Sequence, residues 1–255
     1  MRRLRHLTGQ HRTASINSLL GAVLAFNAGA INAGGFLVVS MYTSHMTGFA
    51  SRVADNLVLG NMRIVLGSVG ALLAFTLGSA VTAILVNGAR QHGLRSEYAL
   101  PLLLEALLLL LFGLMGATMG RETPFAVPLT VLVLSFTMGL QNALVSKISS
   151  SQIRTTHMTG IVTDIGIELG KLIYWNRSGC PYESRVRANR IKLRLLLVLL
   201  GAFITGGVVG AAGFKYVGFI WVVPAALSLL ALCLPPLYSD LQRLKRSVNA
   251  AQREI

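Results

Sequence analysis

Six segments of this chain are apolar for long enough to cross a lipid bilayer as helices. A helix rises 1.5 Å per residue and the hydrocarbon core is about 30 Å thick, so a crossing needs about 20 apolar residues. The six segments run approximately 16–39, 64–86, 99–119, 125–145, 195–214 and 217–237. Because lipid offers no hydrogen bonds to the backbone, such segments have to satisfy their own as helices. The expected fold class is an all-α integral membrane protein with six transmembrane helices.

The composition agrees with lipid as the main solvent. Only 13% of the 255 residues are charged and 53% are hydrophobic, whereas a soluble domain carries about a quarter charged residues. A surface with so few charges is suited to the lipid bilayer, which is the first partner that we expect. The net charge of +14 would suggest nucleic acid in a soluble protein, so its distribution along the chain has to be considered first.

The basic residues are distributed unevenly between the two sides of the membrane. If the N-terminus is cytoplasmic, nineteen of the 23 Lys and Arg residues fall in cytoplasmic segments. Only Arg52, Arg63, Arg121 and Lys215 fall outside. This positive-inside bias predicts a multi-pass protein of the bacterial inner (plasma) membrane with both termini in the cytoplasm. It also accounts for the net charge, so we expect no nucleic-acid partner.

The chain repeats itself. Residues 43–48 read Thr-Ser-His-Met-Thr-Gly and residues 155–160 read Thr-Thr-His-Met-Thr-Gly, with five of six positions identical. Two further pairs of segments resemble each other in the same order along the chain, namely 25–33 with 135–143 and 74–78 with 202–206. Self-similarity at this spacing indicates two copies of one structural unit.

Each copy contains three predicted crossings, and an odd number means that the second copy enters from the opposite side. The predicted organisation is a basic tail (1–15), a first three-helix repeat (16–120), a second, inverted repeat (121–238) and a basic cytoplasmic tail (239–255). Inverted repeats are typical of secondary transporters, whose substrate sites lie near the midplane between the repeats. The polar stretches 42–60 and 155–175, which carry the His-Met-Thr-Gly motifs, are expected to be re-entrant or broken helices.

The motifs also resemble those of a known family. The pattern Ala-Gly-Ala-Ile-Asn-Ala-Gly-Gly-Phe-Leu (28–37) followed by Ser-His-Met-Thr-Gly, with Gly-Leu-Gln-Asn-Ala (139–143) and Thr-His-Met-Thr-Gly in the second half, resembles the YoaK-like family of uncharacterised bacterial inner-membrane proteins. The resemblance covers roughly residues 17 to 237 and implies a membrane location and a multi-pass fold. Members commonly carry Asp where this chain has Asn32, and Asn where it has Phe49.

Polar residues within or beside the apolar segments are the candidate substrate-binding residues. Three amides lie inside predicted helices, and six residues belong to the two Thr-x-His-Met-Thr-Gly elements. The set is Asn32, Thr43, His45, Thr47, Gln141, Asn142, Thr155, His157 and Thr159. Amides in a bilayer face the bundle interior, because an unpaired amide in lipid is costly. These residues either line a substrate or ion path or make polar packing contacts; two His and two Met could ligate a soft metal, although we expect none.

Three ionisable residues complete the candidate set. Glu105 lies two turns inside the third apolar segment, where an acidic residue is a possible proton carrier. Its alternative is a side chain that reaches the surface or caps a neighbour. Arg52 and Asp164 occupy equivalent repeat positions with opposite charges, which predicts a structural pair across a pseudo-twofold axis.

The leading functional hypothesis is a transporter or permease of an unknown small solute, with a route between the two repeats. One alternative is a membrane-embedded enzyme that uses His45 or His157 as an acid or base; another is a non-transporting scaffold subunit. Nothing in the chain resembles a nucleotide-binding loop, a zinc-protease helix or a serine nucleophile elbow, so we expect neither an enzyme nor a cofactor. A homodimer is compatible with the sequence.

Overall fold

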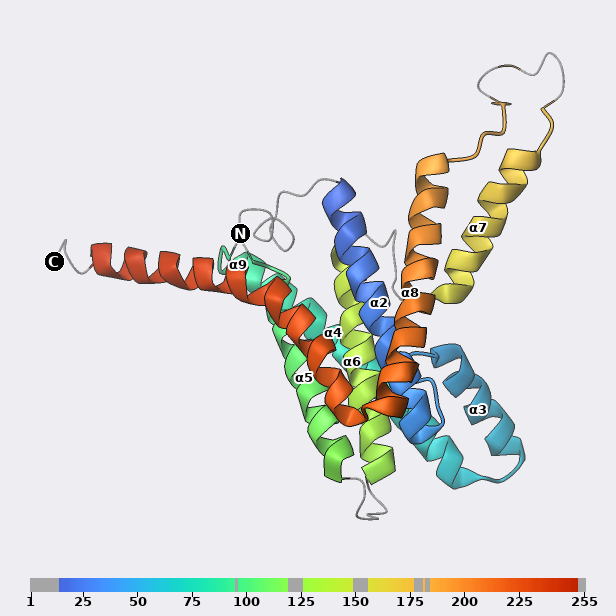
Figure 1. Ribbon diagram of the computed structural model, residues 1–255, viewed down its shortest axis with the longest axis horizontal. Helices are drawn as coiled ribbons and strands as arrows, with labels where there is room; N and C mark the ends of the chain where they lie inside the picture. The colour runs from blue at the N-terminus through green and yellow to red at the C-terminus, as the bar shows by residue number, and fades with distance from the viewer. Residues whose placement is uncertain are drawn as a thin grey trace.

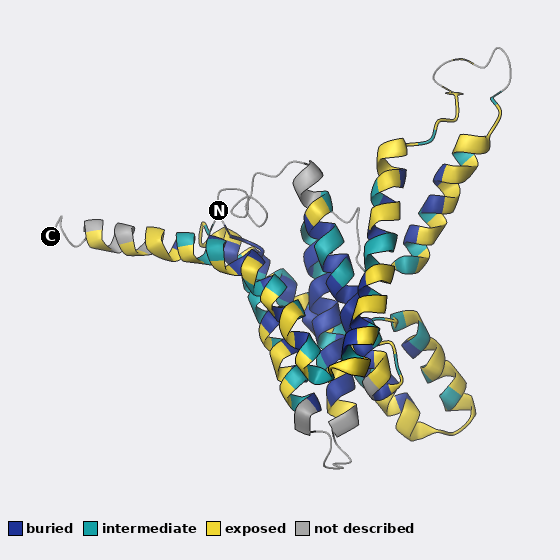
Figure 2. Ribbon diagram, viewed as in Figure 1, coloured by how far each residue is buried: buried dark blue, intermediate teal, exposed yellow. Residues whose placement is uncertain are grey.

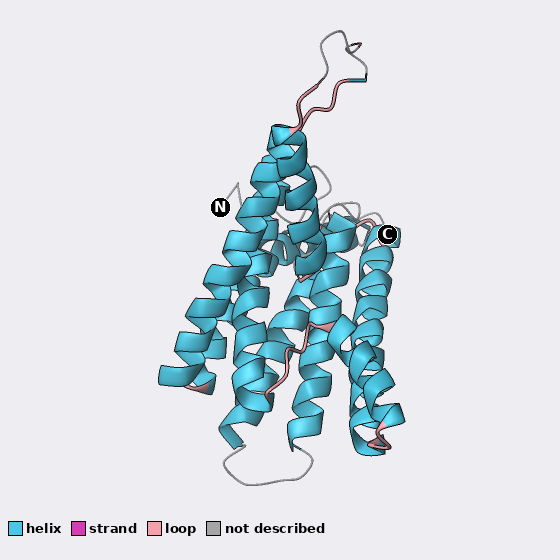
Figure 3. Ribbon diagram, turned by 90° about the vertical axis from the view of Figure 1, so that its right-hand side faces the viewer, coloured by secondary structure: helices cyan, strands magenta, loops and turns pink. Residues whose placement is uncertain are grey.

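The computed structural model describes residues 14–94, 96–118, 126–148, 156–176, 181 and 184–251. Over these residues the chain is helical and has no strand (Figures 1 and 3). Six helices are long, namely α2 (Ala14–Val39), α4 (Met62–Gln91), α5 (Ala99–Thr118), α6 (Ala126–Ile148), α8 (Arg190–Tyr216) and α9 (Val222–Ala251). Two are shorter, α3 (Met46–Val58) and α7 (Met158–Ile173), and a 3₁₀ turn, η2 (Phe219–Trp221), precedes α9.

The six long helices confirm the six predicted crossings. Each is long and apolar enough to span a membrane, and each overlaps one of the predicted segments along most of its length. Their outward faces carry large apolar side chains, such as Leu73, Leu77 and Leu114, each more than half exposed. Figure 2 shows this arrangement, with buried residues along the centre of the bundle and exposed ones around it. An exposed apolar surface of this extent is suited to lipid.

The long helices pack as pairs that join the two halves of the chain. The most extensive contacts are those of α2 with α8, of α4 with α6 and of α5 with α9. Neither half of the chain therefore forms its core alone. The two shorter helices lie against one partner each, α3 on α4 and α7 on α8, and they point toward opposite ends of the molecule (Figure 1).

Glycines allow two of these pairs to approach until their backbones touch. A Cβ atom added to Gly29 of α2 would lie 2.1 Å from the carbonyl oxygen of Phe203 on α8, and one on Gly206 would lie 2.0 Å from that of Phe26. The α4–α6 pair has the same arrangement. A Cβ atom added to Gly78 would lie 2.1 Å from the carbonyl oxygen of Phe136, and one on Gly139 would lie 2.0 Å from that of Phe75. Small residues are the usual means of such close packing in membranes.

The last long helix extends into the predicted basic tail (239–255). α9 continues without interruption to Ala251. Pro235 and Pro236 lie inside this helix, where proline bends a helix, and Figure 1 shows the bend. Asp240, beyond the bend, accepts hydrogen bonds from the backbone N–H (2.9 Å) and the hydroxyl (2.6 Å) of Ser96, which fastens the α4–α5 connection to α9.

Candidate functional site

A cavity of about 720 Å³ lies where the two His-Met-Thr-Gly elements meet. Its walls come from both halves of the chain. They are formed by Asn32, Tyr42, Ser44, His45, Met46, Thr47, Phe75, Ser79, Asn142, Ala143, Ser146, Thr156, His157, Met158, Thr159 and Phe203. Many of these residues are matched pairs of the sequence repeat, such as His45 with His157 and Phe75 with Phe203. The volume falls within the range of about 300–1,000 Å³ that is typical of small-molecule sites.

Each histidine of the motif lies directly before a helix. His45 is the N-cap residue of α3 and His157 that of α7, with similar backbone angles (φ −91°, ψ 72° and φ −83°, ψ 58°). The imidazole folds back over the first turn, because a Cβ on Gly48 would lie 2.6 Å from His45 Nδ1 and one on Gly160 would lie 2.4 Å from His157 Nδ1. This packing explains the glycine three residues after each histidine: any larger residue would displace the ring.

The two intramembrane asparagines hold the segments that carry the histidines. Asn32 Oδ1 accepts hydrogen bonds from the backbone N–H of Ser44 (3.3 Å) and from its hydroxyl (2.9 Å). Asn142 Oδ1 accepts one from the backbone N–H of Thr156 (3.4 Å). Each bonded residue directly precedes a motif histidine. The amides therefore position non-helical backbone whose N–H groups would otherwise lack partners away from water.

The electrostatics of the cavity are dominated by two helix N-termini. The first N–H groups of a helix have no intrahelical acceptor and carry a partial positive charge. Neither His45 nor His157 caps these groups with its side chain, and the first two residues of each helix line the cavity. No Asp, Glu, Lys or Arg belongs to the lining. The cavity thus combines two positive helix ends and two imidazoles with hydroxyl and amide groups.

The structure brings most of the predicted site residues together, but not all. Asn32, His45, Thr47, Asn142, His157 and Thr159 line the cavity. Thr43 is fully buried outside the lining and its hydroxyl has no hydrogen-bond partner in the structure. Gln141 is also buried, and its Nε2 donates to the carbonyl of Leu24 at 3.1 Å. Thr155 lies outside the described residues.

Sequence reasoning missed the aromatic and hydroxyl residues of the walls. Phe75 and Phe203 belong to the lining, and they occupy matching positions in the repeat, 128 residues apart. That match was a usable signal, since aromatic side chains are common in ligand sites. Ser79 and Tyr42 had no comparable signal, because their partners in the repeat, Gly207 and Arg154, are of different types.

Glu105 lies apart from this cavity. Its side chain is fully buried on α5, and neither carboxyl oxygen has a hydrogen-bond partner among the described residues. Among the described residues, the side chain therefore neither reaches the surface nor caps a neighbour.

The predicted pairing of Arg52 with Asp164 is not found. The carboxylate of Asp164 lies 3.0 Å from Lys192 Nζ instead. The reason is the direction of the two short helices, which begin at the cavity and diverge from it (Figure 1). Both residues lie seven positions beyond a motif histidine, about 10.5 Å along each helix, so the divergence separates them.

In the described part of the chain, no three His, Cys, Asp or Glu residues are grouped so that they could hold a metal ion.

Comparison with known proteins places the chain in a family. A family model described as "Protein of unknown function (DUF1275)" matches residues 20–234. The chain is also similar to the UPF0700 transmembrane protein YoaK of Bacillus subtilis (strain 168), with 25% identity over 225 residues, which cover 84% of this chain and 92% of that protein. No solved structure matches it. The chain is thus a multi-pass membrane protein and belongs to the DUF1275 family, which includes YoaK-like proteins.

Proposed function

We propose that this protein is a permease for a small solute that carries an anionic group, with the 720 Å³ cavity as its substrate site. The observation that carries the proposal is that two helix N-termini, α3 and α7, meet at one cavity in the interior of a membrane protein. Half-helices whose N-termini face an anionic substrate group are a recurrent feature of secondary transporters. The imidazole N–H groups of His45 and His157 would add hydrogen-bond donors for the same anionic group.

The proposed architecture is a pair of inverted repeats, as the odd number of crossings in each half suggests. Support comes from contacts that recur in both halves. The Gly29–Phe203 and Gly139–Phe75 contacts match, as do the hydrogen bonds that Asn32 and Asn142 accept. A site at the interface of two such repeats can open to either side by movement of one repeat against the other. Glu105 would supply the proton-coupling group.

The proposed topology has both termini in the cytoplasm of a bacterial cell, and cysteine labelling tests it. In a variant that lacks the native cysteines, Asn61→Cys should react from outside intact cells with a membrane-impermeant maleimide. Trp175→Cys should react only after the cells are opened. Both positions are exposed and follow the two short helices, which point toward opposite ends of the molecule (Figure 1). Reaction of both residues from the same side would contradict the inverted arrangement.

The substrate class is tested by ligand-induced stabilisation of the purified protein. A ligand that binds only the folded state raises the unfolding temperature, so a panel of small carboxylates, phosphates and matched neutral solutes can be compared. We expect anions to stabilise the protein and the His45→Ala, His157→Ala double variant to bind them at least tenfold more weakly. His92→Ala is the matched control, since His92 lies at the end of α4, outside the cavity lining.

Two outcomes would count against the proposal. If the double variant binds as tightly as the unaltered chain, the histidine elements do not form the substrate site. If anions bind but the protein reconstituted into vesicles does not take them up, the site belongs to a receptor or scaffold and not to a permease.

A further inference from the structure

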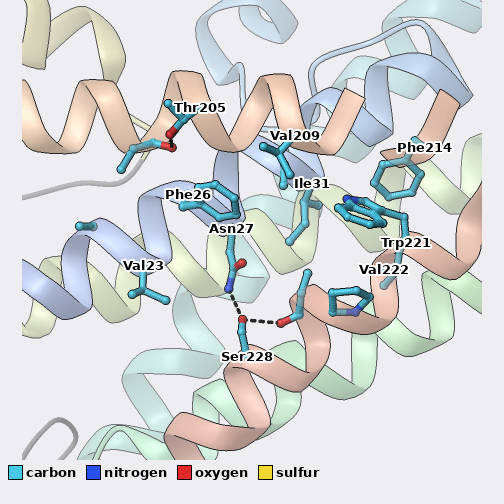
Figure 4. Close-up of a pocket in the computed structure, with 15 residues that line it drawn as sticks. Val23, Phe26, Asn27, Ile31, Thr205, Val209, Phe214, Trp221, Val222 and Ser228 are labelled. Carbon is cyan, nitrogen blue, oxygen red and sulfur yellow. Dashed lines mark hydrogen bonds between the residues drawn. The ribbon is translucent and has the colours of Figure 1, made fainter. Parts of the chain in front are cut away.

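A second cavity, of about 400 Å³, lies between α2, α8 and α9. Figure 4 shows its lining, in which Val23, Phe26 and Ile31 of α2, Val209 and Phe214 of α8, and Trp221 and Val222 surround a single polar pair. That pair is Asn27 and Ser228.

The mouth of this cavity faces the lipid. Thr205, Val209 and Pro224 belong to the lining and are exposed. All three lie inside helices that are long and apolar enough to span the membrane. Thr205 is 11 residues from the end of α8 at Tyr216, about 17 Å along the helix, so this side of the mouth lies deep in the hydrocarbon layer. A molecule that enters here has to come from the bilayer.

The polar pair leaves one hydrogen-bond acceptor open. Asn27 Nδ2 donates to Ser228 Oγ at 2.7 Å, and the Ser228 hydroxyl donates to the carbonyl of Ala225 at 2.7 Å. Asn27 is 97% buried, and its Oδ1 accepts no hydrogen bond from any described residue. A saturated hydrocarbon chain alone would leave this oxygen unpaired at a cost in free energy. A hydroxyl group would satisfy it.

The helix pair that corresponds to α2 and α9 in the other half of the chain, α6 and α5, packs differently. Pro101 and Pro224 are each the third residue of their helices, α5 and α9, and Glu105 and Ser228 are each the seventh. Yet α5 packs closely on α6, whereas α9 barely touches α2. Where α9 presents Ser228 to an open space, α5 buries Glu105.

We propose that the α2–α8–α9 cavity binds a lipid-soluble molecule with an uncharged hydroxyl head, which donates a hydrogen bond to Asn27 Oδ1 while the hydrocarbon part extends past Val209 and Trp221 to the bilayer. An uncharged head is required, because no charged residue lines the cavity and a lone charge at this depth is costly. This inference does not depend on the permease assignment.

Trp221 gives a direct readout, because bromine atoms quench tryptophan fluorescence on contact. The chain has two tryptophans, so Trp175→Phe leaves Trp221 as the only one. The probes are dibrominated oleyl alcohol and the dibrominated hydrocarbon of the same chain length, added to the protein in nanodiscs of unbrominated lipid. We expect the alcohol to quench at a concentration about tenfold lower than the hydrocarbon, and Asn27→Leu to remove this difference.

Variants that fill the cavity separate specific binding from contact with bulk lipid. Ala225→Leu on α9 and Ala22→Leu on α2 narrow the cavity from opposite walls, and each should weaken quenching by the alcohol at least tenfold. Val223→Leu is the matched control, since Val223 is exposed on α9 and outside the lining. In this variant the alcohol should quench Trp221 at the same concentration as in the parent protein. Equal quenching by both probes, or unchanged quenching in both filled variants, would overturn the proposal.

Discussion

A single methyl group at Gly139 or Gly206 is expected to cost this protein most of its folded yield. The added Cβ would lie 2.0 Å from a backbone carbonyl oxygen of the partner helix, that of Phe75 or Phe26. No side-chain rotation relieves such a contact, so the helices have to separate. Overpacking of a core already costs about 1–3 kcal/mol when side chains can adjust, and we expect Gly139→Ala and Gly206→Ala to cost at least about 3 kcal/mol each. The measurements are monodisperse yield and thermal unfolding in detergent.

The matched controls are glycines of the same helices or their partners that face open space. A Cβ on Gly67 of α4 or on Gly201 of α8 would meet no atom within 4 Å. Because alanine is a better helix former than glycine by roughly 1 kcal/mol, Gly67→Ala and Gly201→Ala should keep or slightly raise stability. If Gly139→Ala and Gly206→Ala unfold at the same temperature as these controls, the α4–α6 and α2–α8 backbones do not touch at these glycines.

Removal of the acidic group of Glu105 is expected to stabilise the protein. Both carboxyl oxygens are buried without a partner, and burial of a polar group without a hydrogen bond costs roughly 1–3 kcal/mol in proteins. Leucine is similar in size and suits the apolar interior, so Glu105→Leu should raise stability by on the order of 2 kcal/mol. If Glu105 couples proton movement to transport, the same variant should lose the pH dependence of uptake.

Gln141 provides a partial contrast. It is equally buried and its Oε1 has no partner among the described residues, but its Nε2 donates a hydrogen bond to Leu24 O at 3.1 Å. A buried hydrogen bond contributes about 0.5–1.5 kcal/mol net, so Gln141→Leu should gain less stability than Glu105→Leu. A drop in stability for Glu105→Leu would show that the carboxyl group has a partner after all.

Much of the candidate site was predictable because its residues stand out in an apolar sequence. Asn32, His45, Asn142 and His157 are polar residues within or beside segments that lipid or protein must surround, and such residues face the interior. What each side chain does was not predictable. The asparagines bind backbone N–H groups of the segments before the histidines, and this depends on how the chain turns between α2 and α3 and before α7.

The sequence by itself determined the membrane location, the six crossings and the pairing of motif with motif, because these follow from segment length, hydropathy and repetition, which are local properties. Tertiary structure alone decided which residues meet. Asp164 pairs with Lys192 and not with Arg52, because two helices that begin at one cavity diverge from it. The side chain of Asn27 lines a cavity, because α9 makes little contact with α2. The side chain of Glu105 is fully buried, because α5 packs against α6. Helix directions and separations of this kind arise from contacts between whole helices, most of them far apart along the chain, which no local pattern encodes.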